Sequence, residues 1–341
     1  MRWKLGLAAA ALIVAGLAYW GLRVYTPPIE GAAPIASLEP VALGGAKQWV
    51  LIRGRNRHAP IVLFLHGGPG MPMMYLAYAF QRPLEKDFLV VQWDRLGAGK
   101  SYEAGANDVA KMRISREIAD TVELIEKLRA RFGARKVILV GHSYGSTIGV
   151  RVAAARPDLV RAYVGVGQVA CSRPEELKLQ DAWLADQAKR RGDAGVLAAA
   201  TAHKPYDRQS ALFRYGGELA GATGFMRLVM IGLGAPEYSL MDVFNVKRGV
   251  DFTHAHLIDD VSHGALMDDV TALGVPVYFF EGRRDYTAPF SCAVRYFNRL
   301  KAPEKHLVWF GHAAHFPFLS EPQAFATALR RVAAETRATG N

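Results

Sequence analysis

Short apolar runs alternate along most of the chain with segments of helical periodicity. Each run is bounded by glycine or charged residues, which is typical of strands that are buried on both faces of a sheet. We expect strands at 48–53, 60–67, 87–94, 136–143, 161–168, 275–282 and 306–311. A polar turn separates the first two, so we expect them to form an opening hairpin.

The segment 115–133 is the clearest predicted helix. Its apolar side chains repeat at helical spacing and so share one stripe: Ile118, Val122, Ile125, Leu128 and Phe132. Gly133 stands where a glycine C-cap would end the helix. Strands that alternate with helices of this kind predict an α/β fold, with a mostly parallel sheet covered by helices on both faces.

One region breaks the alternation. Between residues 171 and 263 we find no convincing strand, but several helical stretches that are punctuated by glycine. We therefore expect a helical insertion between two core strands, placed as a lid over the carboxyl ends of the strands.

The N-terminal segment is apolar enough to enter a membrane. Leu5 to Leu22 is a run of 18 residues without a charge, just long enough to span a hydrocarbon layer of about 30 Å. Arg2 and Lys4 precede the run and Arg23 follows it, which favours an N-terminus inside the cell and a body outside. We expect an uncleaved anchor in the inner membrane. A cleaved signal peptide, giving a secreted or periplasmic protein, is the alternative.

These patterns divide the chain into five parts. Residues 1–25 are the predicted anchor helix, and the proline-rich residues 26–40 are a predicted extended linker. The α/β core is expected at 41–170 and 264–335, on either side of the helical insertion 171–263.

Composition and charge exclude some classes of protein but do not indicate a particular function. The chain of 341 residues is 51% hydrophobic and 21% charged, which is an ordinary globular balance. The formal net charge is +11, yet the lysines and arginines are scattered, so we expect no nucleic-acid partner. Cys171 and Cys292 are too few for a disulfide-rich scaffold and could form one bridge or none.

The sharpest chemical signal is the stretch Gly141-His142-Ser143-Tyr144-Gly145, which fits the pattern G-x-S-x-G. An apolar run precedes it, and a helix-compatible stretch of small residues follows it. A nucleophilic serine on a sharp strand-to-helix turn needs glycine on both sides, because side chains there would collide with neighbouring backbone. Ser143 is therefore the candidate nucleophile.

A second glycine-rich stretch, HGGPG at 66–70, also follows a predicted strand. Backbone amides in such a loop can point at a developing oxyanion. We expect the amide of Gly68 and the amide of Tyr144, directly after the nucleophile, to form an oxyanion hole. The loop fits neither a phosphate-loop nor a dinucleotide-binding frame, which disfavours a nucleotide site.

Six stretches in chain order resemble the proline iminopeptidase-like branch of the α/β-hydrolase fold: HGGPG, VVQWDRLGAGKSY, GHSYGS, AYVGVGQ, EGRRDYTAP and AHFPFLSEP. The resemblance spans roughly residues 40 to 330, excludes the anchor and is loosest in the insertion. It implies an α/β-hydrolase fold with a Ser-His-Asp triad. The mechanism of such a triad requires no cofactor or metal.

The resemblance also implies the other two triad members. Asp285 follows a buried strand and a turn, and it matches the position of the family's acid. The loop after the last strand offers two candidates for the base, His312 and His315. The family's aromatic-proline stretch and Glu-Pro pair fall at the right distance when counted from His315, so we assign the base to His315. We expect His142 to be a buried packing residue and Asp94 to fix the backbone of its own turn.

The expected reaction is attack of Ser143 on a carbonyl, followed by hydrolysis of an acyl-enzyme. The resemblance implies an aminopeptidase that removes N-terminal residues, proline among them, from short peptides. A carboxylate must then hold the substrate ammonium, and the insertion offers four acids, of which we prefer the last: Glu175, Glu176, Glu218 and Glu237. A carboxylesterase or amidase acting on small acyl substrates is the alternative, and a non-catalytic binding protein on a hydrolase scaffold is a remote one.

A cluster of metal-ligating residue types near the end of the insertion suggests a zinc hypothesis: His254, His256, Asp259, Asp260 and His263. Its spacing matches no H-E-x-x-H frame, so a polar surface is the default interpretation. The sequence leaves the oligomeric state open.

Overall fold

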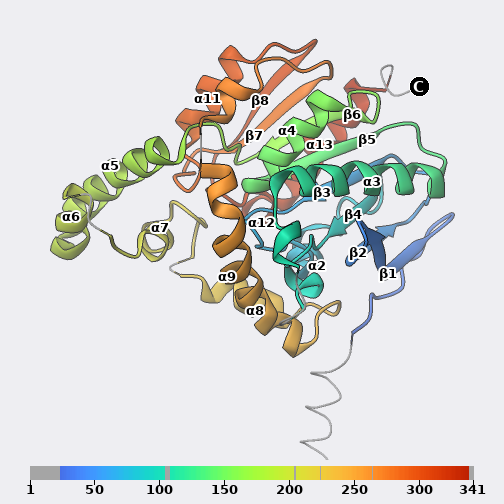
Figure 1. Ribbon diagram of the computed structural model, residues 1–341, viewed down its shortest axis with the longest axis horizontal. Coiled ribbons are helices and arrows are strands. Elements are labelled where there is room, and N and C mark those ends of the chain that lie inside the picture. The colour runs from blue at the N-terminus through green and yellow to red at the C-terminus, as the bar shows by residue number, and fades with distance from the viewer. Residues whose placement is uncertain (1–23, 104–107, 203–204, 223, 263, 338–341) are drawn as a thin grey trace, which may run out of the picture.

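The computed structural model describes residues 24–103, 108–202, 205–222, 224–262 and 264–337; within 240–262, side chains are described as far as Leu257. These residues build one eight-stranded sheet with helices around it (Figure 1). The strands are β1 (Ile35–Leu43), β2 (Ala46–Gly54), β3 (Ile61–Leu65), β4 (Leu89–Trp93), β5 (Val137–His142), β6 (Val160–Val166), β7 (Val277–Gly282) and β8 (Lys305–Phe310).

The sheet is mostly parallel, as the sequence predicts. Its strand order is β1-β2-β4-β3-β5-β6-β7-β8. Every neighbouring pair from β4 to β8 is parallel, whereas β2 runs antiparallel to both β1 and β4. The carboxyl ends of β3 to β8 therefore lie along one edge of the sheet, where sites form in folds of this kind.

The predicted hairpin between 48–53 and 60–67 is wrong. Strand β2 pairs with β1 and β4, and β3 lies beyond β4. Six of the nine residues of β1 fall within the predicted linker, because the four prolines of 26–40 indicated an extended linker rather than a strand. The structure accommodates Pro40 because β1 is an edge strand. Trp49, opposite Pro40, directs its N–H to Ser101 and its C=O to the N–H of Asp94 on the other side of β2.

Helices cover both faces of the sheet, which explains why most strands read as continuous apolar runs. One face carries α3 (Ile114–Phe132), α4 (Tyr144–Ala155) and α11 (Phe290–Arg299), and the other carries α2 (Ala77–Phe80), α12 (Pro317–Ser320) and α13 (Pro322–Glu335). Short 3₁₀ turns occur at η1 (Met74–Leu76), η2 (Gly99–Ser101) and η3 (Val109–Lys111). Helix α3 confirms the prediction for 115–133, and Gly133 adopts the left-handed conformation of a C-cap, with φ 68°.

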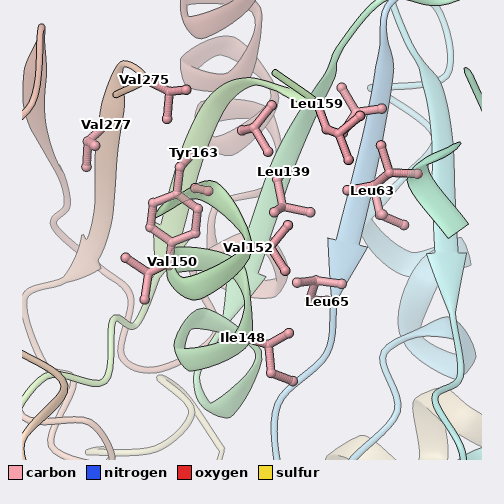
Figure 2. Packing of buried hydrophobic residues seen from close by; sticks show 14 of the residues in the cluster. Leu63, Leu65, Leu139, Ile148, Val150, Val152, Leu159, Tyr163, Val275 and Val277 are labelled. Carbon is pink, nitrogen blue, oxygen red and sulfur yellow. The ribbon is translucent and has the colours of Figure 1, made fainter. Parts of the chain in front are cut away.

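The packing of α4 on the sheet fixes the turn that carries Ser143. Figure 2 shows Ile148 and Val152 of α4 beside Leu65 of β3 and Leu139 of β5, and all four side chains are fully buried. Deleting part of such a side chain costs about 2–5 kcal/mol. The turn between β5 and α4 is therefore held at both ends by the core.

The chain between β6 and β7 is helical, in agreement with the pattern in the sequence. It forms α5 (Arg173–Arg191), α6 (Ala194–Thr201), α7 (Arg208–Tyr215), α8 (Met226–Leu233) and α9 (Leu240–Ser262), and α10 (Leu266–Asp269) follows. Figure 1 shows α5 and α6 projecting to one side of the sheet and α8 below it. A disulfide joins Cys171, just before α5, to Cys292 in α11, so the pair forms the one bridge that the sequence allowed.

The predicted anchor at 1–25 lies outside the described residues except for Val24 and Tyr25. Within the part of the chain that the structure describes, no helix combines the length and the hydropathy that a membrane span requires. The N–H of Tyr25 donates to the carbonyl of Pro236 at 3.0 Å.

Candidate active site

Ser143 occupies a strained turn between β5 and α4. Its backbone has φ 53° and ψ −126°, in a region that side chains rarely adopt. The flanking glycines allow the turn to fold this tightly. A Cβ on Gly145 would lie 2.2 Å from the carbonyl oxygen of Leu65, and a Cβ on Gly141 would lie 2.7 Å from the carbonyl oxygen of Gly145. The glycines of the G-x-S-x-G pattern are therefore required for steric reasons.

The structure pairs His315 with Asp285. The Nδ1–H of His315 donates to Oδ2 of Asp285 at 2.7 Å, and both side chains are buried. Two backbone amides, those of Thr287 and Ala288, donate to the other carboxylate oxygen of Asp285 at 3.0 Å. This hydrogen bond holds the proton of the neutral imidazole on Nδ1 and leaves Nε2 unprotonated. A general base requires this tautomer.

The electrostatic setting of His315 favours its protonated form. Burial by itself lowers the pKa of His315, but the charge and hydrogen bond of Asp285, with smaller contributions from Glu218 and Glu176, outweigh burial and raise the pKa above its ordinary value. The competing candidate His312 is exposed, and its backbone N–H donates to Glu321. His315 rather than His312 therefore has the environment of a base.

His142 is a buried, hydrogen-bonded residue, as the sequence predicts. Its Nε2–H donates to the carbonyl oxygen of His315 at 2.8 Å, and the two rings lie 4.7 Å apart. Burial, followed by the charge of His315, lowers the pKa of His142 well below its ordinary value, so the ring is neutral. It thereby holds the backbone of the loop that carries His315.

The loop 66–70 lies directly beside the serine. A Cβ on Gly67 would lie 3.0 Å from the Cβ of Ser143. Gly68 has φ 115°, which only glycine adopts readily, and a Cβ there would lie 2.4 Å from the backbone nitrogen of Gly70. The chain can thus bring the backbone of this loop close to the serine only with glycines at these positions.

A buried ion pair connects this loop to Tyr144. Arg95 donates to Glu117 at 2.9 Å and to the carbonyl oxygen of His66 at 2.8 Å. The hydroxyl of Tyr144 donates to the second oxygen of Glu117. Arg95 and Glu117 therefore hold both of the backbone segments that the sequence assigns to the oxyanion hole. Asp94 fixes its own turn as predicted, because it accepts from the N–H of Lys100 at 2.9 Å.

Glu237, the preferred ligand for a substrate ammonium, lies elsewhere, and that prediction is wrong. Its side chain accepts a hydrogen bond from Thr26 at 3.1 Å and lies near Arg53 of β2. Because four strands separate β2 from β7, Glu237 lies far along the sheet from Asp285, which follows β7. It holds the N-terminal segment, a contact that sequence spacing does not predict.

Two other acids of the insertion face the His315–Asp285 pair. Glu176, in the first turn of α5, is buried, and its Oε1 has no hydrogen-bond partner among the described residues. Burial raises the pKa of Glu176 to about 7. Glu218 is also buried, accepts from the hydroxyl of Thr287, and has its carbonyl bonded to the N–H of His315 at 2.9 Å. Burial likewise raises the pKa of Glu218.

Glu175, the remaining candidate, is on the surface. Its carboxylate pairs with Arg295 at 2.6 Å in an exposed salt bridge. The neighbouring positions 175 and 176 of α5 therefore point in different directions, one into solvent and one toward the site.

Gly167, which the sequence did not single out, makes room for the side chains of His315 and Asp285. It has φ 54°, and a Cβ there would lie 2.8 Å from Nδ1 of His315 and 2.9 Å from Oδ2 of Asp285. The glycine at the end of the β6 run was the available signal. Within the described part of the chain, no three or more His, Cys, Asp or Glu side chains form a group that could hold a metal ion. The side chains of Asp259, Asp260 and His263 lie outside that part.

Comparison with known proteins defines the class. A family model described as the alpha/beta hydrolase fold matches residues 60–322, so the chain belongs to the α/β-hydrolase family and is a hydrolase. Its relatives include an aminopeptidase and several proline iminopeptidases. "Probable aminopeptidase YbaC" from Bacillus subtilis (strain 168) is 32% identical over 307 residues, which cover 87% of this chain and 96% of that protein.

A further relative supports the same branch, and a solved structure supports the fold. The proline iminopeptidase of Heyndrickxia coagulans is 25% identical over 280 residues, covering 79% of this chain and 88% of that protein. The crystal structure of a proline iminopeptidase-related protein from Thermus thermophilus matches with a TM-score of 0.64 at 22% identity, covering 88% of this chain and 98% of that one, which shows the shared fold. The predicted family is confirmed.

Proposed function

We propose that the chain is a serine hydrolase in which Ser143, His315 and Asp285 act as a triad. His315 takes the proton of the serine hydroxyl through Nε2 while Ser143 attacks the substrate carbonyl, and Asp285 stabilises the imidazolium that forms. His315 then returns the proton to the leaving group, and water hydrolyses the acyl-enzyme. The observation that carries this proposal is the buried His315–Asp285 hydrogen bond at 2.7 Å beside a strained serine turn.

The backbone amides of Gly68 and Tyr144 are the proposed oxyanion donors. The close approach of Gly67 to Ser143, and the position of Tyr144 at the start of α4, support this assignment. A single such donor contributes about 3 kcal/mol of transition-state stabilisation. Because both donors belong to the backbone, the pair Arg95–Glu117 is what keeps them in place.

The proposed substrate is a short peptide with a free N-terminus, from which the enzyme releases the first residue. The aminopeptidase and proline iminopeptidase relatives support this choice of reaction. Glu176 and Glu218 are the proposed anchors for the substrate ammonium, because both are buried carboxyls that act electrostatically on His315. Glu176 is the stronger of the two, since its Oε1 has no partner among the described residues.

A matched pair of variants on adjacent residues tests the substrate. Glu176→Gln should lower kcat/KM for aminoacyl-arylamides by about 10–100-fold, because a hydrogen bond to a charged group contributes about 1.5–3 kcal/mol. Substrates whose amino group is acylated should be affected little. Glu175→Gln, one residue away on the surface, is the control and should behave like the parent enzyme.

Turnover by the full chain would be measured on both substrate classes, with Ser143→Ala as the blank. Equal losses for free and acylated amines in Glu176→Gln would refute ammonium binding by this residue. Cleavage of short-chain esters without cleavage of any arylamide would identify a carboxylesterase instead, with the triad unchanged.

We also propose that residues 1–25 anchor the enzyme in the inner membrane with the catalytic body outside. The uncharged run from Leu5 to Leu22 supports an anchor, and the disulfide Cys171–Cys292 supports an oxidising compartment. Protease added to spheroplasts should digest the body. Complete protection of the body in intact spheroplasts would contradict this orientation, and a mature N-terminus beyond residue 25 would indicate cleavage.

A further inference from the structure

Helices α8 and α9 present apolar side chains to the outside of the molecule. Met226 and Met230 of α8 and Phe244 of α9 are 66%, 60% and 61% exposed. They belong to a set of six large exposed apolar side chains, which we call the α8–α9 face: Phe225, Met226, Met230, Leu240, Met241 and Phe244.

This face is additional to the surface that the two helices bury. Leu228 and Gly232 of α8 and Val246 of α9 already pack against the body. A helix on a protein surface normally turns polar residues outward, and a contiguous exposed apolar patch marks an interaction site. We therefore expect the α8–α9 face to contact another molecule or a membrane.

The N-terminal segment leaves the body next to this face. Tyr25 donates its N–H to Pro236, in the connection between α8 and α9, and Thr26 donates to Glu237. Arg53 also donates to the carbonyl of Pro27, at 2.6 Å. Figure 1 shows that the described chain begins at the same lower side of the molecule as α8. The apolar run that ends at Leu22 thus stops three residues before a fixed contact with the α8–α9 connection.

The charges around the face favour an anionic surface. Arg227 of α8 and Arg248 of α9 are exposed on the same two helices, whereas the exposed Lys247 of α9 is paired with Asp251 at 2.6 Å. Asp242, the acid nearest the start of α9, forms a salt bridge with Lys100 at 2.7 Å, and both side chains are mostly buried. Large apolar side chains flanked by basic ones are the composition of a helix that lies in a membrane interface.

We propose that the α8–α9 face lies in the outer boundary of a lipid bilayer that contains anionic lipids. Tyr25, Thr26 and Pro27 are bonded to the body, so an anchor that ends at Leu22 leaves little chain to separate this face from the membrane. The face would enter the boundary between headgroups and acyl chains, to a depth of about 5–10 Å. The direction of approach rests on the anchor proposed above, whereas the contact of the face with lipid is tested independently of it.

Site-directed fluorescence on the full chain tests the contact. The two native cysteines are joined in a disulfide, so a single introduced cysteine can be labelled with an environment-sensitive dye. The test positions are Met230→Cys and Met241→Cys. The control is Asn298→Cys, an exposed position on α11, which lies at the opposite end of the molecule from α8 in Figure 1.

The labelled proteins are reconstituted into vesicles of phosphatidylethanolamine and phosphatidylglycerol with or without brominated acyl chains. We expect brominated lipid to quench the dye at positions 230 and 241 and to leave the dye at 298 unchanged. Vesicle flotation of the same samples reports on the anchor. Protein that floats with unquenched dyes at 230 and 241 would overturn the proposed face while leaving the anchor intact. Protein that does not float and is not quenched would overturn both.

A charge variant separates contact with lipid from contact with a second copy of the chain. Met230→Glu combined with Met241→Glu should abolish quenching of a dye at Phe244→Cys, while turnover of a soluble substrate stays unchanged. If the dye becomes shielded from water as the protein concentration rises, and brominated lipid does not quench it, another copy of the chain covers the face. That result would overturn the bilayer proposal.

Discussion

At the scale of single residues, the arrangement around His315 determines how the proposed site responds to pH. Asp285 and the acids Glu176 and Glu218 surround one imidazole in a buried setting, so the protonated form gains more from its neighbours than it loses by burial. A base must be neutral to accept a proton, and the raised pKa of His315 means that protonation persists to a higher pH than usual.

We therefore predict that kcat/KM falls as the pH drops through a value above about 6.5, the ordinary pKa of histidine. An uncharged ester substrate should be used, so that ionisation of a substrate amine does not contribute to the profile. Asp285→Asn removes the charge that raises the pKa, so its acid limb should shift to lower pH, and its rate should fall by about 10⁴-fold. An acid limb that is unchanged in Asp285→Asn would contradict the assignment of His315 as the base.

At the scale of elements, the strand-turn-helix unit β5–α4 explains how the serine is positioned. The core holds the strand and the helix, and glycines allow the turn between them to pass close to β3. The close contacts of Gly145 are with backbone atoms of Leu65 and His66, which cannot move aside as a flexible side chain could.

Gly145→Ala should therefore destabilise the protein by about 1–3 kcal/mol, the usual cost of overpacking, and should also lower turnover. Gly195→Ala is the matched control. Gly195 lies in α6, with 3.7 Å between an added Cβ and its nearest neighbour, Asp193, so alanine there should be neutral or stabilising by about 0.5–1 kcal/mol. Urea unfolding of both variants measures the difference. Equal stabilities would mean that the turn relaxes around the added methyl group.

At the scale of the whole molecule, the disulfide ties the helical insertion to the α/β core. It joins residues 121 positions apart, so the closed loop contains the whole insertion together with β7. Closing a long loop restricts the unfolded chain more than a short one, and this restriction stabilises the folded state.

We predict that the double variant Cys171→Ser/Cys292→Ser loses about 2–5 kcal/mol of unfolding free energy. Reduction of the parent protein should reproduce the loss, and the same reductant should leave the double variant unchanged. A reductant that destabilises both proteins equally would show that the effect does not come from this bridge.

Much of the core was predictable because its signals are local. Buried strands appear as apolar runs, α3 appears as a stripe ending in Gly133, and the serine turn appears as two glycines at fixed distances from Ser143. Each signal depends on neighbours within a few residues, where the periodicity of strands and helices and the limits on φ act directly.

Strand pairing and the choice among distant acids were not predictable in this way. The sequence placed β2 beside β3 because they are adjacent in the chain, whereas the sheet inserts β4 between them. It preferred Glu237, whereas the fold directs Glu176 and Glu218 toward His315 and uses Glu237 to hold Thr26.

The sequence by itself therefore determined the α/β class and the family, and it predicted Ser143, Asp285 and His315 as the triad, because steric and periodic constraints restrict the residues near one another in the chain. The tertiary structure decided the order of the strands, the pairing of the cysteines, the acids that face the site, and the exposure of the α8–α9 face. Those features depend on contacts between residues far apart in the chain, and the local spacing of residues carries no information about such contacts.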